Sequence, residues 1–128
     1  MNSPHGLEFE YVSGGLIVRA TKEAQFDQRV AFAQLIADAI RKQPIKTLLV
    51  DLRETPGPKT FMDRYQLGEL AATYLPRIPI AVLMRDEQTD KQLIGKLVAR
   101  NRGVELEVFN DPAAAATWLK KHTNPPGS

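Results

Sequence analysis

The chain has 128 residues, of which 43% are hydrophobic and 25% charged, and its formal net charge at pH 7 is +2. That size and composition are typical of one globular domain, and the mixing of acidic and basic residues along both halves argues against a nucleic-acid-binding surface. Cysteine is absent, which excludes disulfides, thiol nucleophiles and thiolate metal sites and fits a cytoplasmic location. We find neither an apolar signal segment nor an apolar run of the ~20 residues that span a bilayer.

The first part of the chain predicts a β-hairpin and a helix. After a polar lead-in at residues 1–6, apolar and polar residues alternate over residues 7–12, and a Ser-Gly-Gly turn signal precedes a returning strand at residues 16–20. A helical apolar stripe then runs from about Ala24 to Lys42. Thr21 is placed to cap the start of this helix.

The central stretch predicts a strand, a tight loop and a second helix. Lys46–Arg53 contains a nearly continuous apolar run, the pattern of a strand that is covered on both faces. The Pro-Gly-Pro sequence at residues 56–58 ends the strand in a polar loop. The second helix is expected over Phe61–Leu75, with Phe61 on its apolar face.

The rest of the chain continues to alternate strands and helices. A strand is expected at Pro79–Arg85, a helix from about Asp90 to Asn101, and a strand at Val104–Phe109 with one exposed face or an edge position. Asp111-Pro112 is a capping residue followed by proline at the first helical position, and it predicts a last helix through residues 113–121, anchored by Trp118. Residues 123–128 are expected to form a disordered tail.

The order of elements is therefore ββαβαβαβα, in a single α/β domain at residues 7–122. Strands separated by helices are expected to be parallel and joined by right-handed crossovers. The predicted fold class is a mixed five-stranded sheet, made of an N-terminal antiparallel hairpin and three parallel strands and flanked by about four helices.

Several short sequence motifs, in their order and spacing, resemble those of the SpoIIAA-like branch of the STAS-type domains. These domains are small α/β modules, and some are also compared with CRAL-TRIO lipid-binding domains. The motifs are Val50-Asp51-Leu52-Arg53, Asp63-Arg64-Tyr65, Ile80-Ala81-Val82, Asn101-Arg102-Gly103, Val108-Phe109-Asn110-Asp111 and Trp118-Leu119. The resemblance extends from Leu7 to Leu119 and implies a STAS-like fold. In the anti-sigma-factor antagonists of this family, a phosphorylatable serine begins the helix after the central strand. This chain has no Asp-Ser-Ser word there, and offers Thr55 and Thr60 as the hydroxyls that could be phosphorylated.

The residues that carry catalysis in other proteins are scarce. His5 and His122 lie in the predicted tails, so His-assisted nucleophilic catalysis and His- or Cys-based metal sites find no support. We therefore predict no catalytic residue, no metal and no cofactor. Asp51 ends a buried strand, as the phosphoacceptor of a receiver domain does, but the lysine that this chemistry needs is missing at the end of the last strand. The alternative is that Asp51 binds loop amides or Arg53.

Three segments follow the carboxyl ends of the predicted parallel strands, where the strands meet at one edge of the sheet and helix N-termini offer free amides. We expect a site there for an anion or a partner's carboxylate. The candidate residues are Arg53, Thr55, Gly57, Lys59, Thr60, Arg85, Asp86, Asn110 and Asp111. Arginine at two strand ends is the feature that capping does not require, and the alternative is that Arg53 pairs with Asp51 or Asp86 and holds the loops.

Two further groups have a functional and a structural interpretation. A basic group could form a small patch or a solvated helix face: Lys96, Arg100 and Arg102. An aromatic group could line an apolar cavity for a lipid tail or belong to an ordinary core: Phe26, Phe61, Tyr65 and Tyr74.

The resemblance and the poor catalytic inventory indicate a non-enzymatic regulatory or interaction module, cytoplasmic and of bacterial type, whose partner is another protein or a second copy. The alternative is a carrier of a small apolar or anionic ligand, held at the strand edge or in a cavity beside the second helix. An enzyme working with Asp51, Asp63 or Asp86 is the third hypothesis. A well-formed cavity beside the second helix would favour the carrier, and a packed core with an exposed patch would favour the interaction module.

Overall fold

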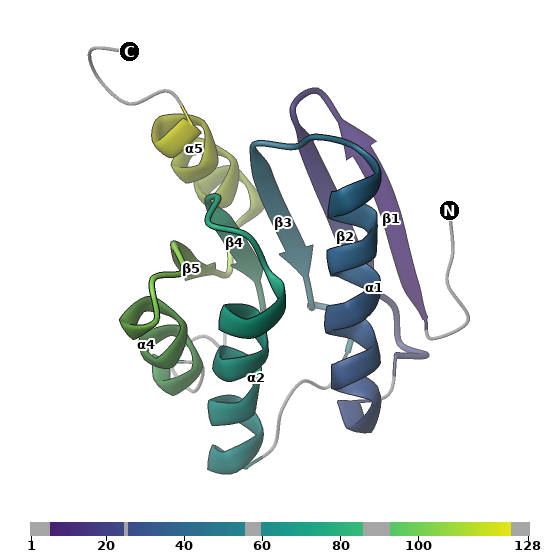
Figure 1. Ribbon diagram of the computed structural model, residues 1–128, viewed down its shortest axis with the longest axis vertical. Helices are drawn as coiled ribbons and strands as arrows, with labels where there is room; N and C mark the ends of the chain where they lie inside the picture. Colours follow the sequence, from purple (N-terminus) through teal and green to yellow (C-terminus); the bar gives the residue numbers. More distant parts are fainter. Residues whose placement is uncertain (1–5, 25, 56–59, 86–92, 124–128) are drawn as a thin grey trace.

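The computed structural model describes residues 6–24, 26–55, 60–85 and 93–123 (Figure 1). The strands are β1 Leu7–Val12, β2 Gly15–Ala20, β3 Thr47–Asp51, β4 Ile80–Leu83 and β5 Leu106–Phe109. The helices are α1 Arg29–Lys42, which follows a 3-10 turn at Phe26–Gln28, then α2 Phe61–Tyr74, α4 Leu93–Asn101 and α5 Pro112–Thr123. The predicted order of elements and the predicted fold class are confirmed.

The strands lie in the sheet in the order of the chain, β1-β2-β3-β4-β5. β1 pairs antiparallel with β2 through the predicted hairpin, where Gly14 adopts a φ of 73° that the lack of a Cβ permits. β2, β3, β4 and β5 are parallel to one another. The second strand of the hairpin thus joins the parallel set, and β5 is an edge strand as its glutamates predict.

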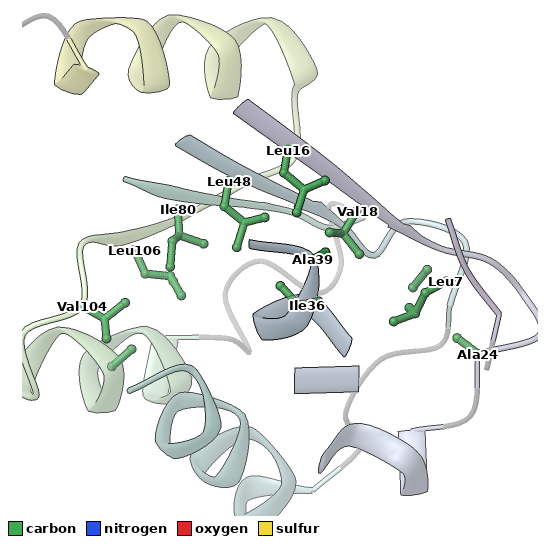
Figure 2. Packing of buried hydrophobic residues seen from close by; sticks show 12 residues of the cluster. Leu7, Leu16, Val18, Ala24, Ile36, Ala39, Leu48, Ile80, Val104 and Leu106 are labelled. Carbon is green, nitrogen blue, oxygen red and sulfur yellow. The ribbon is translucent and has the colours of Figure 1, made fainter. Parts of the chain in front are cut away.

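This linear order determines the layers of the molecule. Each crossover moves one strand further in the same direction, so right-handed crossovers place their helices on the same face of the sheet. α1, α2 and α4 share that face, whereas α5, which follows the last strand, covers the other (Figure 2). The sheet therefore has one face with three helices and one face with a single helix among the described residues.

The main core lies between the sheet and the three-helix layer. Figure 2 shows the side chains of Leu48, Ile80 and Leu106 pointing from the sheet towards these helices, and the first two are fully buried. A smaller cluster fills the space under α5, where the half-buried Trp118 packs on Phe109 with 5.7 Å between ring centres. Trp118 is thus an anchor of α5, as predicted.

The first helix begins later than its apolar pattern predicts. α1 starts at Arg29, and its N-cap position makes no side-chain cap bond. The prediction that Thr21 caps this helix is wrong, because the Thr21 hydroxyl donates to the carbonyl O of Gly6 at 3.0 Å and accepts from the amide N of Glu23 at 3.3 Å. A short polar side chain has found nearer backbone partners in a turn, which is a common alternative to capping.

The last helix continues further than predicted, to Thr123. His122 is therefore helical and does not lie in a tail, and its ring centre is 4.4 Å from that of Trp118. The rest of the predicted tail, the predicted lead-in at residues 1–5 and the predicted helix start at residues 90–92 lie outside the described residues. Within the described ranges, every helix is too short or too polar to cross a membrane.

Candidate functional site at the carboxyl edge of the parallel strands

The carboxyl ends of β3, β4 and β5 lie side by side. Asp51 is in register with Leu83, and Leu83 is in register with Phe109. The pairing continues beyond the strands, because the amide N of Leu52 donates to the carbonyl O of Leu83 and the amide N of Met84 donates to that of Phe109, both at 2.8 Å. The three predicted site segments therefore start from one edge of the sheet.

Asp51 binds Arg53 and so fixes the start of the segment that follows β3. The Nη2 of Arg53 lies 2.8 Å from one carboxylate oxygen of Asp51, and its Nε lies 2.9 Å from the other. The backbone N of Arg53 also donates to this carboxylate, at 3.1 Å. The predicted alternative, in which Arg53 pairs with Asp51, is thus confirmed. The side chain of Asp51 is 13% exposed and that of Arg53 is 42% exposed, so the guanidinium is paired but still reaches solvent.

The surroundings of Asp51 favour its charged form. Partial burial by itself raises the pKa of the Asp51 carboxyl, but the hydrogen bonds from Arg53 and the charges of Arg53 and Arg19 outweigh burial and hold this pKa below its ordinary value. Arg19 is the residue of β2 in register with Asp51. Asp51 is therefore an ionised structural carboxylate at neutral pH.

The two candidate threonines have different surroundings. Thr60 is exposed at the N-cap position of α2, where its hydroxyl accepts a hydrogen bond from the amide N of Asp63 at 3.0 Å. Thr55 is only 7% exposed and lies against the core. Of these two hydroxyls, the one on Thr60 is accessible to a modifying enzyme or a partner.

The other predicted site residues divide into exposed ones and ones that cannot be placed. Arg85, Asn110 and Asp111 are exposed. Asp111 caps α5, because its two carboxylate oxygens accept from the amide N atoms of Ala113 and Ala114, each at 3.3 Å. Gly57, Lys59 and Asp86 lie outside the described residues.

Two large apolar side chains at this edge of the molecule were not predicted as site residues. Phe61 is 60% exposed and Met62 is 57% exposed, in the first turn of α2. The interpretation of Phe61 as part of the apolar face of its helix is wrong, since the first turn precedes the part of α2 that packs in the core. One sequence signal could have revealed the pair, because consecutive residues cannot both lie on a narrow helix stripe.

A cavity of about 160 Å³, which we call the core cavity, lies between the sheet and the three-helix layer. All five strands and α1, α2 and α4 contribute to its walls. Among the predicted aromatic residues, Phe61, Tyr65 and Tyr74 do not line it, and the side chain of Phe26 lies outside the described part. Tyr65 lies instead beneath the guanidinium of Arg102, with 6.0 Å from its ring centre to the guanidinium carbon.

The predicted basic group is paired with acidic residues. The Nζ of Lys96 lies 2.7 Å from a carboxylate oxygen of Glu107, and a guanidinium N of Arg100 lies 3.7 Å from the other. Arg102 pairs with Glu69 at 3.2 Å. These contacts support a solvated, ion-paired helix face. Within the described ranges, no group of three His, Asp or Glu residues could hold a metal ion.

The sheet order and helix placement are those of the STAS-like α/β fold that the resemblance in the sequence implies. The chain is similar to the crystal structure of an anti-sigma factor antagonist from Mycobacterium paratuberculosis, with a TM-score of 0.64 and 15% sequence identity over 94% of this chain and 99% of that chain. The sequence matches no protein-family model and no curated relative. At this identity the likeness establishes the fold alone.

Proposed function

We propose that this chain is a regulatory module that binds a protein partner through the carboxyl edge of its parallel strands, around the start of α2. The observation that carries the proposal is the exposed pair Phe61 and Met62, which we call the docking pair. Large apolar side chains that remain in water side by side are typical of interaction sites, where burying them gives most of the binding energy.

The neighbouring polar groups suggest the chemistry of the partner. Arg53 and Arg85 are exposed at the ends of adjacent strands, and guanidinium groups form strong, directional bonds with carboxylates. A partner with an apolar pocket bordered by acidic side chains would complement this edge. The similar solved structure is named as an antagonist of an anti-sigma factor, a name that describes action on another protein and supports the same class of function here.

Thr60 offers a way to regulate the surface. A phosphate on its exposed hydroxyl would add charge at the N-terminus of α2, immediately before the docking pair. The buried Thr55 is not accessible for this purpose. We therefore place the regulatory modification, among the two candidate threonines, on Thr60.

The experiment first identifies the partner and then measures its binding. A photo-crosslinking amino acid at position 61 in the host cell captures the partner, and one at Val12 is the control, because Val12 is 39% exposed at the opposite, amino edge of the parallel strands. Calorimetry with the purified partner then compares Phe61→Ser and Met62→Ser with Val12→Ser.

We expect each substitution in the docking pair to weaken binding by about tenfold or more, as for interface hot spots, while thermal stability stays unchanged because both side chains are exposed. Val12→Ser should bind normally. If the captured partner is a second copy of the chain, Phe61→Ser should also convert the dimer to a monomer in sedimentation. Unchanged binding by both docking-pair variants would contradict the proposal.

A further inference from the structure

The core cavity has properties that the proposed docking function does not require. Protein interiors are normally close-packed, with few voids larger than a water molecule, and an unfilled apolar void reduces stability. A space of about 160 Å³ in the main core is therefore a feature that packing alone disfavours.

Small residues are frequent in the lining of this space. Six of the lining residues have no side chain beyond Cβ: Ala20, Ala24, Ala33, Gly68, Ala71 and Gly95. α2 contributes Gly68, which packs against Gly95 and Val98 of α4, and Ala71, and its close backbone contacts are with α4 and α1. The helices α1, α2 and α4 thus cover the core cavity without filling it.

The lining defines the chemistry of an occupant. The surrounding side chains are almost all aliphatic, with Phe32 as an aromatic wall. Among the described residues that line the cavity, the Nε of Arg29 donates to the side-chain oxygen of Gln66 at 3.1 Å and Lys96 pairs with Glu107 at 2.7 Å. The pairing of Lys96 with Glu107 and the predominance of aliphatic side chains favour an uncharged occupant.

The volume defines the size of the occupant. An apolar cavity of about 150 Å³ in another protein stays dry and binds benzene or xenon. We propose that the core cavity binds one small, uncharged apolar molecule of the size of a substituted benzene ring. The inference goes beyond the docking function and excludes a long acyl chain, for which the volume is too small. Since α2 both walls the cavity and carries the docking pair, the occupant would stabilise the helix that presents the interaction surface.

The direct test is a benzene titration of the methyl-labelled full chain, followed by NMR. We expect saturable shifts of the Ile36, Val50 and Val82 methyl groups, which line the cavity, and a rise in melting temperature. The methyl groups of Ile17 and Leu119 are controls, because they belong to the opposite face of the sheet and to α5. Shifts that fail to appear at the lining methyl groups would overturn the proposal.

A matched pair of variants locates the ligand. Ala33 and Ala39 are both on α1 and both 8% exposed, but only Ala33 lines the cavity. Ala33→Leu should weaken benzene binding at least tenfold, with stability unchanged or raised because the side chain enters existing space. Ala39→Leu should overpack the core and lower stability, yet bind benzene as the unmodified protein does when compared below its melting temperature.

If Ala39→Leu fails to fold, the smaller substitution Ala39→Val replaces it as the control. Equal benzene affinity in Ala33→Leu and the unmodified protein would contradict the assignment. A long-chain fatty acid that shifts the lining methyl groups at lower concentration than benzene would contradict the proposed size and neutrality of the ligand. Neither result bears on the docking pair, so the two proposals fail independently.

Discussion

Asp51 is the residue that organises the candidate edge. It binds Arg53, two residues further along the chain, and lies in register with Arg19 of the neighbouring strand, and Arg19 pairs in turn with Glu10 at 2.9 Å. Opposite charges thus alternate across three strands. Because Asp51 is mostly buried and accepts several charge-assisted bonds, its contribution should exceed that of an ordinary surface ion pair.

Asp51→Asn should lower the free energy of unfolding by about 1–2 kcal/mol, since it leaves Arg53 and Arg19 without the carboxylate they share. Arg53→Ala should cost about 1 kcal/mol or less, because Arg19 remains near Asp51. Urea denaturation measures both. The control is Asp38→Asn, which removes an exposed pair with Arg41 one turn along α1 and should change stability by less than about 0.5 kcal/mol. Equal effects of Asp51→Asn and Asp38→Asn would contradict this role.

The same carboxylate predicts a pH dependence. The pKa of Asp51 is lowered in the folded state, so the unfolded chain binds this proton more readily. The contribution to stability is fully present above the unfolded pKa of about 3.9 and is lost as pH falls through the folded value. We expect the unfolding free energy to decrease from about pH 5 towards pH 3, with a smaller decrease in Asp51→Asn. Indistinguishable pH profiles for the two proteins would exclude this assignment.

Thr60 permits a test of capping on the same helix that carries the docking pair. Thr60→Ala removes the bond to the amide N of Asp63 and should lower stability by about 1 kcal/mol. Thr73→Ala is the matched control, because the Thr73 hydroxyl bonds back to the carbonyl O of Glu69 inside α2, an arrangement that does not stabilise helices. Thermal unfolding of both variants measures their stability. A Thr60→Ala protein as stable as Thr73→Ala would contradict the stabilising role of the Thr60 cap.

At the level of elements, α2 packs closely against α4 at Gly68, which has no side chain. Gly68 is the buried residue of α2, and a Cβ at this position would clash with the backbone O of Gly95 and lie 2.8 Å from the Cβ of Val98 on α4. Close approach of α2 and α4 therefore depends on glycine. This is a packing reason for a residue that would otherwise weaken the middle of a helix.

Gly68→Ala should lower the free energy of unfolding by about 1–2 kcal/mol, because overpacking against a backbone oxygen outweighs the gain of ~1 kcal/mol in helix propensity. Chemical denaturation of the variant measures the net effect. A substitution at this position that raises stability would show that α2 and α4 separate without penalty.

Most elements are predictable from the sequence because their signals are local. The apolar run of β3, the hairpin turn and the Asp111-Pro112 start of α5 each specify a structure within a few residues. The pairing of Arg53 with Asp51 was also foreseeable, as one interpretation among two. The exposure of Phe61 was missed, although the two consecutive apolar residues at 61 and 62 gave a signal for it, because the exposure depends on where the helix passes the end of the sheet. Likewise, the core cavity results from missing volume on several elements, which no single helical stripe reveals.

At the level of the whole molecule, each strand of the sheet pairs with its neighbour in the chain. Such pairing keeps the sequence separation between contacting strands small, which reduces the loop-closure entropy of each step. The same order places three helices on one face and leaves the other face to α5 among the described residues. The face with three helices contains both the core cavity and the helix that carries the docking pair.

The core cavity should also make this protein responsive to hydrostatic pressure. Unfolding eliminates internal void volume, so a folded state with a large void is destabilised by compression, with volume changes of about 20–100 mL/mol in proteins generally. The midpoint pressure should rise in Ala33→Leu and on saturation with benzene, because each occupies part of the core cavity. High-pressure fluorescence of Trp118, which lies on the far side of the sheet, would report global unfolding. The pressure stability of the folded domain should therefore depend on the same space that receives a small molecule.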